Sequence, residues 1–325
     1  MENLSAMENS SHQSDHQKDQ NKQWMSQLPE KLWDIPLNNL SIPGSHDTMS
    51  YCLDKNSPVD PKSPAMLCVL EKFAPCVARS IILKWSTTQV LNVCEQLNAG
   101  IRYLDLRIAP RPNDPSLTLN FVHGLFTSVT VEETLQEILQ WLQSHPREVI
   151  ILACKNLEEM TPVLHMHLIS CIHQIFGTKL CPKKEQPTLR NMWNQGYQVI
   201  ISYEDDLAMK YEFLWPTIPY WWANTTRTHS LIRYLEKHKE GGRPAGFFVA
   251  GLNLTENWSY ILKHPFGSMK TLTIPKLPLL NKWVQKQHPG PQRDAVNIIA
   301  EDLIGSDNFV SAVINLNRIL TDHQP

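Results

Sequence analysis

Short apolar runs recur along the chain, and spacers long enough for helices separate them. Several runs are β-branched and almost unbroken, as expected of strands whose two faces are both buried. The candidate strands are Leu37–Ile42, Ile101–Ile108, Leu117–Val122, Val149–Cys154, Gln198–Ser202, Thr217–Trp222, Phe247–Leu252 and Asn297–Asp302. Roughly eight strands that alternate with helices predict an α/β fold of the TIM-type (β/α) barrel. An open doubly wound sheet is the alternative, although its glycine-rich dinucleotide turn is missing.

Two of the spacers carry clear helical patterns. Apolar residues form one stripe over residues 131–143, and Thr130 with Glu133 three positions later predicts a capping box at the start of this helix. A second helix is predicted over residues 162–176, where a glycine follows its last residue. Helices of this length between apolar runs support the alternating architecture.

The first residues of the chain differ from the rest. Residues 1–22 are polar and rich in Gln, Asn, Ser and His, so we expect a disordered tail rather than a signal peptide. No linker-like stretch interrupts residues 23–325, which predicts a single catalytic barrel domain. The apolar fraction of 42% supplies a sizeable core, and no run approaches the ~18 apolar residues of a membrane-spanning helix.

Charge and cysteine content narrow the classes of function. The formal net charge is -2 with both signs mixed, which argues against nucleic acid as a partner and leaves local cations to bind any anionic ligand. The 7 cysteines are an odd number without a CxxC pair, as expected of reduced thiols. The sequence therefore predicts a cytoplasmic protein, and it identifies no protein partner.

Polar residues follow most of the apolar runs. Active groups of (β/α) barrels lie at the carboxyl ends of the strands, so these residues are expected to meet at one mouth. They are His46, Asp47, Asp105, Arg107, His123, Lys155, Tyr203, Asn253 and Asp302. Histidines transfer protons near neutral pH, an arginine matches phosphate oxygens, and a carboxylate can orient an imidazole. The joint pattern favours a phosphate-handling enzyme.

Each of these residues, taken alone, also has an ordinary structural explanation. A histidine after a strand is more often a satisfied loop residue than a catalyst. Arg107 can be the partner of a buried charge, Lys155 a solvated lysine, and Asp302 the cap of a following helix.

Three sequence blocks carry a family resemblance. The chain reads LSIPGSHDT at residues 40–48, AGIRYLDLR at 99–107 and FVHG at 121–124, and these blocks resemble in order and spacing the X-box of phosphatidylinositol-specific phospholipases C. The whole chain resembles the small animal X-domain-containing proteins. This resemblance implies a TIM-type barrel in which the inositol 2-hydroxyl attacks the neighbouring phosphorus. Diacylglycerol then leaves, and a cyclic inositol phosphate forms.

The resemblance also implies a role for each residue of the blocks. His46 matches the general base and His123 the general acid. Arg107 matches an arginine that stabilises the phosphoryl oxygens. Asp47 matches an aspartate that assists the acid, and Asp302 matches the late aspartate that orients the base.

The implied substrate is a phosphatidylinositol-type membrane lipid. Lys155 lies where an inositol-contacting lysine is expected, and Asn253 and Tyr203 at the ends of their runs are expected to contact the substrate. A lipid substrate implies peripheral contact with membranes. The apolar, cation-bearing stretch 64–85 either lies at that interface or packs on the barrel as a helix pair.

One departure from the large animal phospholipases C concerns calcium. Those enzymes have a second carboxylate two positions after the first in this block, where the present chain has Asp105 followed by Arg107. Because an arginine removes an oxygen ligand and repels the ion, we expect a metal-independent site without cofactors. In such a site Asp105 is expected to pair with a neighbouring cationic side chain. Asp105 is the fallback calcium ligand if the site does bind calcium.

Two other functions fit parts of the sequence. A glycerophosphodiester phosphodiesterase or related phospholipase D uses a similar barrel. Chains of those families resemble a pattern that opens with an Ala-His-Arg-Gly turn, whereas this chain has PGSHD at the corresponding place. The other candidate is a catalytically silent module that binds lipid or inositol phosphate. Both histidines and Arg107 are present, which favours the enzyme.

Overall fold

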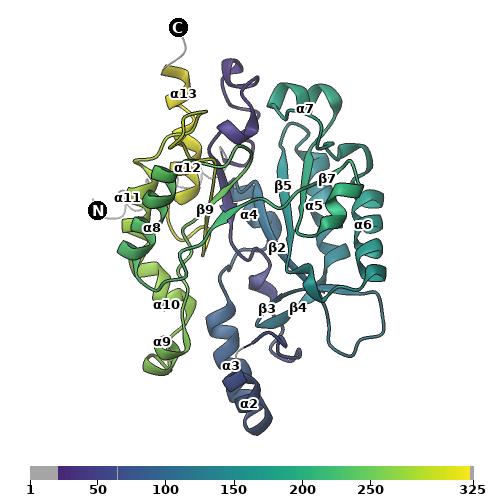
Figure 1. Cartoon of the computed structure of the whole chain (residues 1–325), viewed down its shortest axis with the longest axis vertical. Helices are drawn as coiled ribbons and strands as arrows, with labels where there is room; N and C mark the ends of the chain where they lie inside the picture. The colour runs from purple at the N-terminus through teal and green to yellow at the C-terminus, as the bar shows by residue number, and fades with distance from the viewer. Residues whose placement is uncertain (1–20, 64, 323–325) are drawn as a thin grey trace, which may run out of the picture.

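A curled parallel sheet surrounded by helices forms the body of the protein (Figure 1). The computed structural model describes residues 21–63 and 65–322, so the predicted tail lies outside it except for residues 21 and 22. The strands follow the order β7-β6-β5-β2-β1-β10-β9-β8, and each neighbouring pair is parallel. They are β1 (Ile42–Ser45), β2 (Tyr103–Pro110), β5 (Ile150–Lys155), β6 (Val199–Tyr203), β7 (Leu214–Trp215), β8 (Tyr220–Trp221), β9 (Val249–Gly251) and β10 (Ile298–Glu301).

The sheet makes a TIM-type barrel that is open along one seam. Its edge strands β7 and β8 follow each other in the chain, and no ladder joins them within the described ranges. The helices are α2 (Ala65–Phe73), α3 (Pro75–Ser86), α4 (Val93–Ala99), α5 (Val131–Ser144), α6 (Pro162–Phe176), α7 (Leu189–Gln195), α8 (Thr228–Gly241), α9 (Trp258–Lys263), α10 (Met269–Thr273), α11 (Leu277–Val284), α12 (Phe309–Leu316) and α13 (Ile319–Asp322). The predicted α/β barrel is therefore confirmed. None of the helices in the part of the chain described here is long and apolar enough to cross a bilayer.

The two predicted helices are confirmed. In α5 the Thr130 side chain accepts from the Glu133 backbone, and the Glu133 carboxylate accepts from the Thr130 backbone, which completes the capping box. The second helix, α6, has the predicted bounds and is capped by Gly177. Both helices bury one face against the outer side of the sheet.

The first strand begins later than predicted. Residues 37–39 form a 3-10 turn, and β1 follows it at Ile42–Ser45. The apolar character of the turn comes from burial at the amino end of the barrel rather than from strand pairing. Gly44 is required within β1, because a Cβ there would lie 2.9 Å from Tyr103 Cδ1 in the barrel interior.

One predicted barrel strand belongs to a hairpin instead. The run 117–122 corresponds to β3 (Leu119–His123), which pairs antiparallel with β2 and with β4 (Leu125–Thr130). The barrel strand that was missed is β7, whose two residues are too few to give a pattern. Because β3 runs back along β2, with Phe121 opposite Ile108, it returns His123 to the barrel mouth. The other six predicted runs overlap β2, β5, β6, β8, β9 and β10.

Alternation along the strands decides which side chains enter the barrel. The interior cluster takes alternate residues from several strands, among them Ile42, Tyr103, Ile151, Ile200, Val249 and Ile298. Positions that continue this alternation toward the carboxyl ends are His46, Asp105, Arg107, Lys155, Asn253 and Asp302. The polar residues of the site thus share the inward face of their strands.

A buried ion pair fastens the start of the described chain to the barrel. Arg102 and Glu148 are fully buried, and Arg102 Nη2 lies 2.7 Å from Glu148 Oε2. Arg102 also donates to backbone carbonyls, including that of Lys22, and the Glu148 carboxylate accepts from the backbone of Met25 and Ser26. Each charged group is therefore held in one hydrogen-bonded geometry.

We expect Arg102→Met to lower the free energy of unfolding by about 3–5 kcal/mol, because it leaves the Glu148 carboxylate buried without its cation. Urea unfolding measures this loss. The matched control is Arg190→Met, which removes an ion pair with Asp34 at the surface and should cost far less. Equal losses in the two variants would contradict the role given to the buried pair.

Candidate active site

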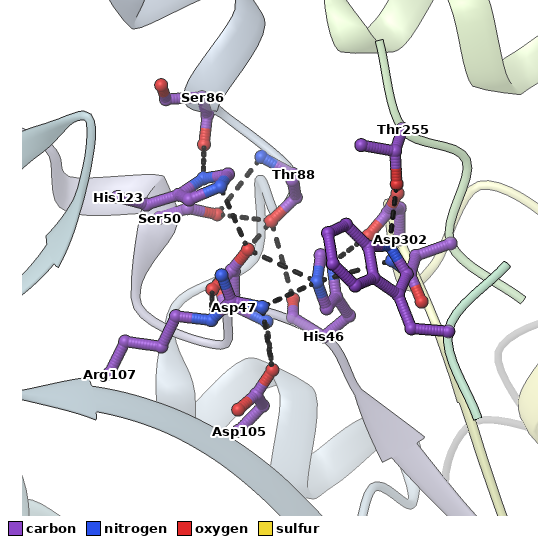
Figure 2. A network of polar contacts seen from close by, with 12 residues as sticks. His46, Asp47, Ser50, Ser86, Thr88, Asp105, Arg107, His123, Thr255 and Asp302 are labelled. Carbon is purple, nitrogen blue, oxygen red and sulfur yellow. Dashed lines mark hydrogen bonds and ion pairs between the residues drawn. The ribbon is translucent and has the colours of Figure 1, made fainter. Parts of the chain in front are cut away.

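The side chains predicted to be catalytic gather at the carboxyl end of the barrel strands (Figure 2). His46, Arg107 and His123 line a cavity of about 250 Å³, whereas Asp47 and Asp302 contact these residues without being part of the lining. Its lining is His46, Thr88, Arg107, His123, Lys155, Tyr220, Trp222, Asn253, Leu254, Thr255, Glu256 and Met269. Imidazoles and two cations around one cavity suit an anionic ligand.

His46 has a partner on each ring nitrogen. It follows β1 directly and is buried, and its Nδ1 lies 2.8 Å from Oδ1 of Asp302, the residue after β10. Arg107 Nη2 lies 2.9 Å from His46 Nε2, and a guanidinium can only donate. These contacts assign the tautomer in which Nδ1 donates to Asp302 and Nε2 holds a lone pair.

The surroundings of His46 also stabilise its protonated form. Burial, the largest influence, lowers the pKa of His46, but the carboxylates of Asp47 and Asp302 outweigh it, so the pKa is raised above its ordinary value. A proton taken up on Nε2 faces Asp47 Oδ2 at 3.3 Å. Nε2 therefore has a donor while His46 is neutral and an acceptor once it is charged, as a general base requires.

His123 is placed between two acceptors. It ends β3, its Nδ1 donates to the backbone carbonyl of Ser86 at 2.8 Å, and its Nε2 lies 3.2 Å from Asp47 Oδ2. Neither partner donates, so both ring nitrogens are satisfied when each carries a proton, which is the form a general acid needs. Gly124 allows Ser86 to approach, because its φ is +71° and a Cβ there would lie 2.5 Å from Ser86 Oγ.

Asp47 lies between the two histidines and the arginine (Figure 2). Its Oδ2 contacts Nε2 of both His46 and His123, and its Oδ1 forms an ion pair with Nε of Arg107. Its φ is +43°, a left-handed conformation that aspartate adopts more readily than most residues. The Asp47 backbone N–H donates to Asp105 Oδ2 at 3.3 Å, which helps to hold this conformation.

Asp105 pairs with both cations of the site, as the sequence predicted. Its Oδ1 lies 3.6 Å from Lys155 Nζ, and its Oδ2 lies 3.5 Å from Arg107 Nη2. Burial alone would raise the pKa of Asp105, but Lys155 and Arg107 hold it well below its ordinary range. Burial lowers the pKa of Arg107 and of Lys155, but the neighbouring carboxylates outweigh it, so the pKa of each cation is raised. All three groups are therefore charged at neutral pH.

A candidate cation site exists where ligand atoms of His46, Asp47 and Asp105 all lie within 4.8 Å of one another. The Arg107 guanidinium contacts all three residues. Its fixed positive charge repels a metal ion from this position. Two carboxylates also fall short of the roughly six to eight oxygen ligands that calcium prefers. The residues present therefore do not fit a calcium ion.

Tyr203 does not reach the cavity, so its expected contact with substrate was wrong. The side chain is fully buried on the outer face of the sheet, and its hydroxyl lies 2.7 Å from Nδ1 of His165 on α6. Ile200 of the same strand enters the barrel interior, so Tyr203 falls on the opposite face. The alternation of faces along β6 could have revealed this.

Sequence analysis missed Tyr220, which orients two residues that it did find. The Tyr220 hydroxyl donates to Asn253 Oδ1 at 2.8 Å, and Lys155 Nζ lies 4.4 Å from the centroid of its ring. Asn253 Nδ2 in turn lies 3.4 Å from His46 Nε2. The alternation of faces along the predicted run 217–222, in which Ile218 enters the barrel interior, could have revealed that Tyr220 points inward.

Solved structures define the class of the fold. The phosphatidylinositol-specific phospholipase C from Listeria monocytogenes aligns with a TM-score of 0.63 and 20% identity, covering 91% of this chain and 98% of that chain. A phosphatidylinositol-specific phospholipase C from Staphylococcus aureus aligns with a TM-score of 0.61 and 15% identity, covering 91% and 97%. The chain thus has the barrel of the bacterial phosphatidylinositol-specific phospholipases C.

Sequence comparisons then define the family. Residues 82–230 match the PI-PLC X domain model (PI-PLC X 1). The chain is 54% identical over 306 residues to PI-PLC X domain-containing protein 1 of Homo sapiens, covering 94% of this chain and 95% of that protein. It is 40% identical over 307 residues to PI-PLC X domain-containing protein 3 of Danio rerio, covering 93% and 94%. The chain therefore belongs to the PI-PLC X domain-containing proteins, as the sequence blocks predicted.

Proposed function

We propose that this chain is a phosphoric diester hydrolase of the phospholipase C type, which cleaves phosphatidylinositol to diacylglycerol and a cyclic inositol phosphate. The observation that carries the proposal is the complementary state of the two histidines. His46 presents a lone pair on Nε2, whereas both nitrogens of His123 face acceptors. Their ring centroids are 6.4 Å apart, so a phosphodiester between them would meet a base and an acid. Membership of the family supports the substrate class.

In the proposed reaction the nucleophile belongs to the substrate. His46 takes the proton of the inositol 2-hydroxyl, whose oxygen forms a bond to phosphorus. The bond between phosphorus and the diacylglycerol oxygen breaks, and His123 gives its proton to that oxygen. Asp302 stabilises the His46 cation, and Arg107 exchanges its contact with His46 for a phosphoryl oxygen. The protein mainly orients the reacting groups and neutralises charge.

Lys155 and Asn253 are proposed to bind the inositol ring. Both line the cavity. Lys155 has more protons than its contact with Asp105 uses, so it can donate to a ring hydroxyl. The Asn253 amide is buried and held by the Tyr220 hydroxyl, so it is oriented before substrate arrives.

Metal independence is a further part of the proposal. Arg107 supplies positive charge at the position where the carboxylates of Asp47 and Asp105 meet. The test is to incubate the purified protein with phosphatidylinositol micelles in excess EGTA and to measure water-soluble inositol phosphates. Release under these conditions supports the proposal. Turnover only after addition of calcium would return Asp105 to the role of ligand, and no turnover in either condition would contradict the proposed substrate.

Exposed apolar side chains at one end of the molecule support peripheral membrane contact. Within the predicted stretch, α2 (Ala65–Phe73) and α3 (Pro75–Ser86) form a helix pair, and α3 buries Ile82 and Trp85. Figure 1 shows that α2–α3 and α9 project from the same end of the molecule. Among the described side chains, Val69, Phe73 and Val77 on α2–α3, Leu262 on α9 and Phe266 just after α9 are apolar and exposed. We propose that they dock on the cytoplasmic face of a membrane.

A groove of about 550 Å³ connects the two projections to the catalytic residues. Its lining includes Ile82 and Trp85 from α3, Trp258 and Ile261 from α9, and His123. His123 is the proposed proton donor to the diacylglycerol oxygen. The groove is therefore the proposed path of the apolar part of the lipid.

The double variant Phe73→Ser/Phe266→Ser is expected to bind phosphatidylinositol vesicles at least about tenfold more weakly, since burial of one phenylalanine contributes roughly 1.5–3 kcal/mol. The two side chains are 84% and 92% exposed, so folding should be little affected. Vesicle sedimentation measures binding, and turnover of soluble short-chain phosphatidylinositol should stay unchanged. The control is Val163→Ser, which removes an apolar side chain 62% exposed on α6. Unchanged vesicle binding of the double variant would refute the docking surface.

A further inference from the structure

The segment that follows α3 runs between the loops that carry the catalytic side chains. Within residues 86–89, the Thr88 hydroxyl oxygen lies 3.3 Å from the backbone carbonyl of His46. The Thr88 carbonyl accepts from the Leu303 backbone at 2.7 Å. The segment therefore contacts both the loop after β1 and the loop after β10.

The Gln89 side chain contacts both loops at once. It is fully buried, and Nε2 donates to the backbone carbonyls of His46 at 2.9 Å and Glu301 at 3.0 Å. Oε1 accepts from the Ile304 backbone at 3.1 Å. Both amide protons and the amide oxygen are thus used. One side chain bridges the backbone of His46 and the backbone on either side of Asp302.

Both loops contain backbone conformations that need support. Asp47, directly after His46, has φ +43°, and Leu303, directly after Asp302, has φ +56°. A leucine seldom adopts this left-handed conformation, and such residues persist only where the surroundings hold them. Hydrogen bonds from Thr88 and Gln89 are among the contacts that restrain these two loops.

We infer that Gln89 is a positioning residue that keeps the His46 ring at hydrogen-bonding distance from the Asp302 carboxylate. The inference rests on the proposed function, in which His46 is the general base. His46 and Asp302 directly follow the paired strands β1 and β10, whose register ends at Ser45 and Glu301 and is extended by the bond from the His46 N–H to the Glu301 carbonyl at 3.2 Å. Beyond this point the two loops separate, and the Gln89 side chain contacts both. Without the three bonds of Gln89 the loops can shift relative to each other. A misplacement on the order of 1 Å costs a catalytic site up to about 10²-fold in rate.

The test is Gln89→Met, which removes both donors and the acceptor with little change in volume. We expect kcat on soluble short-chain phosphatidylinositol to fall by about 10–10²-fold with KM nearly unchanged. The acid limb of the pH profile of kcat/KM should move to lower pH. The reason is that the raised pKa of His46 depends partly on Asp302, so a looser pair lowers this pKa toward its ordinary value.

The matched control is Gln198→Met. Gln198 is also buried, and its Nε2 donates to the carbonyls of Leu142, His145 and Glu148 at the amino end of the barrel. Both variants should lose comparable thermal stability, but Gln198→Met should keep the wild-type kcat and pH profile. An equal loss of kcat in both variants would overturn the positioning role. If Gln89→Met does not fold, the near-isosteric Gln89→Glu keeps an acceptor for Ile304 and replaces the two amide donors by at most one carboxyl proton, so at least one of the two carbonyl contacts is lost.

A proton NMR measurement separates this inference from the proposed function. The Nδ1–H of His46, bonded to Asp302, should give a downfield resonance in the wild type and in Gln198→Met. The resonance should be lost or shifted in Gln89→Met. An unchanged resonance would overturn the inference even if the enzyme is active. A lost resonance would support it even if phosphatidylinositol is not the substrate.

Discussion

Alanine at His46 or at His123 is expected to reduce phosphatidylinositol cleavage by about 10²–10⁴-fold, the usual contribution of one general base or acid. His46→Ala removes the proposed acceptor for the proton of the 2-hydroxyl, and His123→Ala removes the proposed proton donor to diacylglycerol. Initial rates on mixed micelles measure both losses. The control is His229→Ala, which removes an exposed histidine on α8 and should retain the wild-type rate.

A substrate with a better leaving group distinguishes the two roles. A nitrophenyl ester of inositol phosphate can release its leaving group without a proton donor. His123→Ala should therefore recover most of its rate on this substrate. His46→Ala should remain impaired, because the 2-hydroxyl still has to lose its proton. If both variants were equally impaired on both substrates, the assignment of His123 as the general acid would be wrong.

Arg107→Met is expected to lower kcat by about 10²–10³-fold, the usual effect of removing one donor that stabilises the transition-state charge. It also removes the cation that pairs with Asp47. The loss should be the same in excess EGTA and in excess calcium, because the remaining carboxylates do not complete a calcium site. Initial rates under the two conditions give the comparison.

Arg111→Met is the matched control for this effect. Arg111 lies four positions further along the chain, and its Nη2 donates to the Thr127 carbonyl outside the cavity. We expect this variant to keep the wild-type kcat. Recovery of Arg107→Met by calcium would show that Asp47 and Asp105 can act as ligands, and would contradict the metal-independent site.

The residues of the candidate site could be predicted from the sequence because they continue a strand pattern. His46 and Asp302 directly follow buried strands, and Lys155 ends one. A barrel brings the carboxyl ends of its strands to one mouth, so residues far apart in the chain are expected to meet there. The same rule, applied without the alternation of faces, selected Tyr203, which points to the outer side of β6.

Features that depend on contacts between distant segments leave no pattern in the sequence and could not be predicted from it. Gln89 is separated from Glu301 by 212 positions, and nothing local distinguishes it from the equally buried Gln96. The Pro-Gly sequence of β1 opposes strand formation, but pairing with β10 and β2 on its two edges overrides this preference. The antiparallel direction of β3 also could not be predicted, because apolar composition does not distinguish a parallel strand from an antiparallel one.

The identity of the first water-soluble product tests the proposed chemistry most directly. Phosphorus NMR of a phosphatidylinositol digest in excess EGTA distinguishes a cyclic inositol phosphate from an acyclic one. Attack by the 2-hydroxyl, with His46 as base, predicts the cyclic phosphate as the first product and no cleavage of a substrate whose 2-hydroxyl is methylated. An acyclic first product, or cleavage of the methylated substrate, would mean that water attacks phosphorus and would contradict the mechanism proposed for the two histidines.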